Sequence, residues 1–140
     1  MVELEAWYDE EQDDAVIVRT SAELDAVLDT VAGWDGRVLV DLYVAGNPGR
    51  ANFNVGLHGL AGRGVLYYAG SGQKWFSTET PDTDLNSDGR ILYYYMNSDT
   101  EYPADSEIAL DVVRRAAHEF MGTGGERPTA SAWRIAPDWW

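Results

Sequence analysis

The sequence predicts an α+β fold, a mostly antiparallel β-sheet of about six to seven strands with two main α-helices packed on one face. Two observations support this prediction. Short apolar segments, several with period-two alternation, follow one another through most of the chain. Two longer segments instead carry apolar residues at helical spacing. Consecutive strands favour antiparallel pairing. A helix with one apolar face buries that face against another element, which here is the predicted sheet. At 140 residues the chain fits one domain, residues 1–140.

The first strands lie near the N-terminus. Residues 2–8 alternate apolar and polar side chains, which indicates a strand with one wet face. The acidic run 9–14 favours a solvated turn, and the β-branched segment 15–18 is expected to return as the antiparallel partner. Residues 38–44 form a near-continuous apolar run that only Asp41 interrupts, so we expect a mostly buried strand there.

The first helix has a clear start and end. Thr20 and Glu23 have the spacing of a capping box, in which each side chain accepts a hydrogen bond from a free backbone N–H. Four apolar residues follow on one helical face: Leu24, Val27, Leu28 and Val31. We expect this helix to end near Gly33.

The middle of the chain is rich in glycine, which allows tight turns between further strands at 53–57, 65–69 and 90–96. Trp75 and Phe76 form a shorter candidate strand. In the segment 90–96, Tyr93, Tyr94 and Tyr95 must alternate between the two faces of the sheet, so we expect them to divide between core and surface.

A second helix is predicted after Pro103. Apolar residues from Ala109 to Phe120 define one helical face, and Asp105 or Ser106 is a plausible N-cap. Gly122 and Gly124 are natural terminators. Residues 130–135 are expected to form the last strand.

The charge is strongly negative and unevenly distributed. The net charge is −14, with 12 acids and 2 bases in residues 1–41, no acid in 42–78, and 12 acids and 5 bases in 79–140. Such a chain repels nucleic acid and anionic membranes and suits a basic protein partner. There is no cysteine, no apparent signal peptide and no run of ~20 apolar residues, so we expect a cytoplasmic protein.

The residues offer little for catalysis or for holding a cofactor. His58 and His118 have no accompanying nucleophile or zinc-binding motif, and no phosphate-binding glycine motif is present. Residues 84–91 match the first eight positions of an EF-hand loop, but Tyr95 stands where the bidentate glutamate is required. We therefore expect no enzyme activity, no cofactor and no metal.

The last third of the chain carries a recognisable combination of motifs. They are Glu101-Tyr102-Pro103, Ser106-Glu107-Ile108, His118-Glu119-Phe120-Met121, Gly122 to Pro128, and Trp133. This combination resembles the first-numbered immunity-protein family of bacterial polymorphic toxin systems, which is often found beside nucleic-acid deaminase toxins. The resemblance covers roughly residues 60–135, with one extra glycine at Gly124-Gly125.

The resemblance implies a small cytosolic protein that binds one cognate toxin domain, blocks its active site and performs no chemistry itself. The toxin would be basic and act on nucleic acid. The shared residues are expected to maintain the fold: Pro103, Phe120, Gly122, Gly124, Arg127, Pro128 and Trp133. The alternative hypothesis is an acidic adaptor module with an unknown partner.

The toxin-facing surface is predicted from charge and aromatic content. One candidate is the acidic run Asp9, Glu10, Glu11, Asp13 and Asp14. The other is the segment with Asp82, Asp84 and Asp88, with Trp75 and Phe76 as the aromatic residues beside it.

Overall fold

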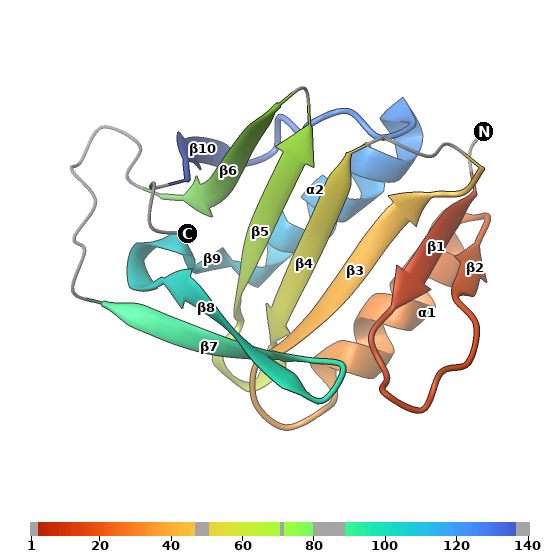
Figure 1. The fold of residues 1–140 in the computed structure, drawn as a ribbon, viewed down its shortest axis with the longest axis horizontal. Coiled ribbons are helices and arrows are strands. Elements are labelled where there is room, and N and C mark those ends of the chain that lie inside the picture. Colours follow the sequence, from red (N-terminus) through yellow and green to blue (C-terminus); the bar gives the residue numbers. More distant parts are fainter. Residues whose placement is uncertain (1–2, 47–50, 71, 80–88, 137–140) are drawn as a thin grey trace.

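The computed structural model describes residues 3–46, 51–70, 72–79 and 89–136. Within these ranges, ten strands form one sheet and two α-helices cover one of its faces (Figure 1). The mostly antiparallel α+β class is therefore confirmed, whereas the expectation of six to seven strands was too low. Asp82, Asp84 and Asp88 lie outside the described residues.

The strands are β1 (Leu4–Trp7), β2 (Val16–Val18), β3 (Val38–Val44), β4 (Asn52–His58), β5 (Arg63–Gly70), β6 (Gln73–Thr78), β7 (Arg90–Tyr95), β8 (Ser98–Pro103), β9 (Ile108–Ala109) and β10 (Ala132–Ile135). The helices are α1 (Ser21–Ala32) and α2 (Leu110–Thr123), with short 3-10 turns η1 (Gly59–Ala61) and η2 (Ala104–Ser106). The main sheet has the order β10-β6-β5-β4-β3-β1-β2, in which neighbours pair antiparallel.

Helix α1 confirms the local prediction. The Thr20 hydroxyl accepts a hydrogen bond from the Glu23 backbone N–H at 3.1 Å. The Glu23 carboxylate accepts from the N–H of Arg19 at 2.7 Å, one residue before the cap. The predicted apolar face is buried against the sheet: Leu24, Val27, Leu28 and Val31.

Helix α2 begins later than its sequence suggests. Asp105 and Ser106 do not cap it, because they lie in η2, where the Ser106 hydroxyl donates to the carbonyl of Pro103. The helix starts at Leu110 without a side-chain cap. At its other end, Gly124 has a φ of +75°, a left-handed conformation that glycine adopts without steric cost.

The sheet has a core on each face. The larger core lies between the sheet and the two helices and includes Leu42, Phe53 and Phe120. The smaller core lies under the β7–β8 hairpin, which crosses the opposite face of the sheet (Figure 1). Its buried residues are Leu39, Val65, Tyr67, Phe76, Tyr93 and Tyr102.

The hairpin fits onto the sheet because Gly56 leaves room for it. A Cβ at Gly56 would lie 2.8 Å from the ring of Tyr93. The hairpin itself turns at Met96 and Asn97, with φ values of 48° and 69°. Positive φ at both central residues is the geometry of the tight turn that best matches strand twist. The hairpin also pairs with the first residue of β3, where Val38 and Tyr94 are parallel partners.

Candidate partner-binding surface

The acidic turn between β1 and β2 is an ordered structure. The side-chain carbonyl of Gln12 accepts hydrogen bonds from the backbone N–H groups of Tyr8 and Asp9, both at 2.9 Å. Its amide donates to the carbonyls of Ala6 at 3.1 Å and Asp14 at 3.2 Å. Because Gln12 satisfies the backbone from inside the turn, the acidic side chains around it can point outward.

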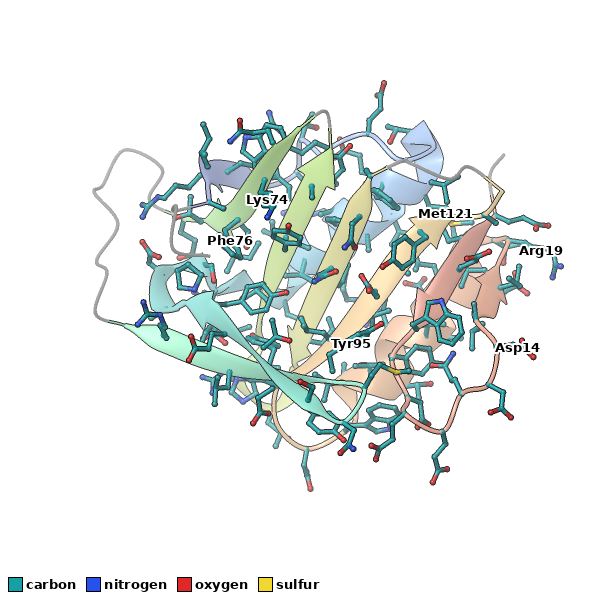
Figure 2. All side chains as sticks on the ribbon, viewed as in Figure 1. Asp14, Arg19, Lys74, Phe76, Tyr95 and Met121 are labelled. Carbon is teal, nitrogen blue, oxygen red and sulfur yellow. The ribbon has the colours of Figure 1, made fainter. Side chains whose placement is uncertain are left out.

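Four of the five predicted acids in this turn are exposed, namely Glu10, Glu11, Asp13 and Asp14, and Asp9 is half-buried. Figure 2 shows Asp14 at the margin of the molecule. The Asp9 carboxylate accepts a hydrogen bond from the N–H of Glu11 at 3.0 Å. The hydrogen bonds thus hold several acidic side chains on an ordered turn, so a partner can bind them without first ordering the loop.

The β7–β8 hairpin lies against this turn. The Tyr94 hydroxyl donates a hydrogen bond to Glu10 Oε2 at 3.1 Å. In Figure 1 the tip of the hairpin and the β1–β2 turn are side by side at the lower right. The place of the hairpin beside the acidic turn was not predicted, because its approach to the turn depends on the three-dimensional course of the chain.

The outer face of the hairpin carries both apolar and acidic groups. Leu92 is 50% exposed and Tyr94 38% exposed. Their register partners across the hairpin, Glu101 and Asp99, are exposed acids. We define the acidic corner as these residues together with the turn: Asp9, Glu10, Glu11, Asp13, Asp14, Leu92, Tyr94, Asp99 and Glu101.

The three consecutive tyrosines divide as alternation requires. Tyr93 is fully buried, Tyr94 faces outward, and Tyr95 points back toward the sheet with partial exposure (Figure 2). The prediction that they split between core and surface is confirmed. Alternation was the one sequence signal that could have identified Tyr94 as a surface residue.

A partly buried ionic cluster holds the hairpin in place. Glu107 Oε2 accepts hydrogen bonds from the Tyr93 hydroxyl at 2.7 Å and from Arg37 Nε at 3.0 Å. Burial raises the pKa of Glu107, but the hydrogen bonds from Arg37 and Tyr93 outweigh that effect and leave the pKa lowered. The carboxylate therefore stays charged and fastens β7 to the start of β3.

The predicted aromatic pair lies elsewhere. Phe76 is 3% exposed and belongs to the core under the hairpin, so its ring is not available to a partner. Trp75 is half-buried on the helix side of the sheet, with the Arg127 guanidinium 4.3 Å from its ring centroid. Strand β6 is separated from β2 by β5, β4, β3 and β1, so the structure does not bring these residues to the acidic turn.

The shared motif residues mostly make contacts within the fold. Phe120 stacks on Phe53 with a centroid distance of 4.6 Å. The Trp133 indole donates to the carbonyl of Pro128 at 2.7 Å, and Pro103 is buried at the end of β8. Gly122 is exposed within α2, and a Cβ there would meet nothing within 4 Å, so no contact explains that glycine.

The two histidines make contacts typical of structural residues. His118 Nε2 is 2.8 Å from Asp25 Oδ1, and Arg114 donates to the same oxygen at 3.1 Å, which joins α2 to α1. His58 Nδ1 is 3.8 Å from Glu107 Oε2. Among the described residues, no group of three or more histidine, aspartate or glutamate side chains could hold a metal ion.

Comparison with known families decides the classification. The family model for Immunity protein Imm1 matches residues 12–135, which includes the hairpin, the C-terminal motifs and only the last part of the acidic turn, from residue 12 onward. The chain belongs to this family. The resemblance predicted from residues 60–135 is therefore confirmed, and the match extends it toward the N-terminus.

Membership in the Imm1 family implies that the protein neutralises a toxin. This favours the immunity hypothesis over the adaptor hypothesis. Among curated proteins, none gives a significant match to the sequence. Within the described ranges, neither helix is long and apolar enough to cross a membrane.

Proposed function

We propose that this Imm1 protein neutralises a cognate toxin domain that acts on nucleic acid, as a deaminase, by covering the toxin's basic active-site cleft with the acidic corner. The observation that carries the proposal is the contact between Glu10 and Tyr94. It joins an ordered acidic turn to exposed apolar side chains, which is the combination expected of an interface with a basic protein.

Electrostatics supports the choice of partner. An enzyme that binds nucleic acid needs positive charge in its cleft to hold phosphates. The net charge of −14 would steer the two proteins together, and the exposed acids of the corner would face that cleft. Leu92 and Tyr94 would supply the apolar contacts that charge alone does not provide.

Asp82, Asp84 and Asp88 stay as a second candidate acidic segment. Trp75, which is partly exposed under Arg127, stays as a candidate contact distant from the acidic corner. Phe76 is left out because its ring is buried.

Co-expression with the toxin domain encoded beside this gene tests the proposal. The wild-type protein should restore growth. A variant with Glu10→Gln, Glu11→Gln, Asp13→Asn and Asp14→Asn should lose protection at matched expression. The control removes four exposed acids outside the acidic corner: Glu3→Gln, Asp29→Asn, Asp111→Asn and Glu126→Gln. Equal protection by both variants would rule out the acidic turn as the toxin-binding element.

A further inference from the structure

Three side-chain oxygens lie buried near the hairpin without a hydrogen-bond donor. They are Asp41 Oδ1, Asn52 Oδ1 and Asn54 Oδ1. Asp41 and Asn54 are register partners on β3 and β4, and Asn52 lies two residues from Asn54 on the same face. This face is the one opposite the helices. We call these three residues the acceptor cluster.

The donors present do not complete the cluster. The Tyr43 hydroxyl donates to Asp41 Oδ2 at 3.0 Å, and Tyr95 also donates to this carboxylate. The Asn54 amide donates to the Tyr102 hydroxyl at 3.1 Å. Buried polar groups are normally hydrogen-bonded, so three acceptors gathered without a donor favour the binding of a group that brings donors or positive charge.

Among the described residues, none of the groups that shift the pKa of Asp41 is a cation. Asp41 is 8% exposed, and burial raises its pKa to about 6 despite the hydrogen bonds from Tyr43 and Tyr95. Four phenols lie around it: Tyr43 on β3, Tyr67 on β5, Tyr95 on β7 and Tyr102 on β8. On the neighbouring strand β1, its register partner is Trp7, which does not titrate, and Glu5, the register partner of Tyr43, is a partly buried carboxylate on the same face.

The cluster lies where the hairpin stops covering the sheet. Tyr43 and Asn52 are both partly exposed, so this end of the cluster borders the protein surface. Ala69, the register partner of Asn52, contributes only a methyl group beside it. Tyr95 links the acceptor cluster to the acidic corner, because it borders the cluster and directly follows Tyr94 in the chain.

We propose that the acceptor cluster binds one lysine or arginine side chain of the toxin, which enters past Tyr43 and Asn52 and pairs with Asp41. This inference rests on the proposed function and names the chemistry of one contact within it. A cationic side chain would supply the donors that Asp41 and the two asparagines lack. A desolvated charge pair of this kind is typical of residues that dominate binding energy.

Binding of the neighbouring toxin domain to Asp41→Asn and to Asp111→Asn tests the inference. Asp111 is an exposed acid on α2, so its neutralisation is a matched control for net charge. Loss of one partner from a buried pair should weaken binding by about 30-fold or more, whereas loss of an exposed charge should change it by about twofold or less. Equal affinities of Asp41→Asn and wild type would overturn the inference and leave the proposed function intact. Failure of the wild type to bind the toxin would instead remove the proposed function.

A second measurement uses only the wild-type protein and therefore needs no variant to fold. The ¹³C resonance of the Asp41 carboxyl should titrate near pH 6 in the free protein and at a lower pH in the complex. An unchanged or higher midpoint in the complex would count against a cationic occupant. A midpoint in the free protein that magnesium chloride lowers but a tetramethylammonium salt at equal ionic strength does not would show a small cation in the cluster and would also overturn the inference.

Discussion

Tyr94 and Glu10, 84 positions apart in the chain, meet in a hydrogen bond of 3.1 Å between the hydroxyl and the carboxylate. This contact brings the β7–β8 hairpin against the acidic β1–β2 turn. Neither segment alone combines an ordered cluster of acids with an exposed aromatic ring. The acidic corner therefore exists only in the folded protein.

Substitution of Tyr94 should affect toxin binding through the loss of its ring. Tyr94→Ala should weaken the affinity about tenfold, as expected for an exposed aromatic residue near the centre of an interface. Tyr94→Phe keeps the ring and should retain most of the affinity. Ile135→Ala removes an exposed apolar side chain from β10, at the opposite end of the sheet, and serves as the control in calorimetric titrations. A loss for Ile135→Ala as large as that for Tyr94→Ala would move the interface away from the acidic corner.

Glu107→Gln should lower the stability of the protein, because Glu107 pairs with Arg37 under the hairpin. This change leaves the Arg37 guanidinium without its charged acceptor, and we expect a loss of about 1–3 kcal/mol in the free energy of unfolding at pH 7. The pKa of Glu107 is lowered in the fold, so its contribution is present above the unfolded value of 4.5 and disappears as pH falls through the folded value. Urea denaturation at several pH values should show the wild type and the variant converging as the pH falls below the unfolded value of 4.5 and through the lowered folded value. A difference that stays constant even where Glu107 of the folded protein is protonated would mean that the charge of Glu107 is not the source.

Local features of the sequence predicted the parts of the fold that depend on neighbouring residues. Thr20 and Glu23 sit three positions apart and define the start of α1 by their own hydrogen bonds. The alternation of Tyr93 and Tyr94 likewise follows from strand geometry alone. Such signals need no knowledge of distant partners.

Other features could not be predicted, because they depend on contacts between distant segments. Strand β8 is polar and largely exposed, so only its pairing with β7 makes it a strand. Phe76 was expected at the surface, but it is buried because the hairpin crosses its face of the sheet. Ser106 has the chemistry of a helix cap, but its hydroxyl is bonded within η2.

Two glycines should respond in opposite ways to substitution by alanine. Gly56→Ala would place a Cβ 2.5 Å from Val65 Cγ2 and 2.8 Å from the Tyr93 ring, so we expect a loss of about 1–3 kcal/mol in stability. Gly122→Ala meets nothing within 4 Å inside α2 and should stabilise the protein by about 0.4–1 kcal/mol. Both values can be read from chemical denaturation. Destabilisation by Gly122→Ala would show that this glycine has a packing role that the structure does not reveal.

Asp41 should reduce the stability of the free protein. Its pKa is raised by burial to about 6 from 3.8, so the folded state holds the proton more tightly than the unfolded state. Stability should then fall as pH rises from about 4 to about 6, with a full penalty on the order of 2–3 kcal/mol above that range. Asp41→Asn removes the penalty and should raise the melting temperature at pH 7 but not at pH 4. A variant less stable than wild type at pH 7 would show that the carboxylate is well accommodated.

Amide hydrogen exchange of the protein alone and in complex with the neighbouring toxin domain can locate the interface itself. We expect slower exchange on binding in residues 8–15 and 90–101, which contain the acidic corner, and little change in α1 and α2. Protection confined to the helices, with unchanged exchange in both of these segments, would show that the toxin binds the opposite face of the sheet.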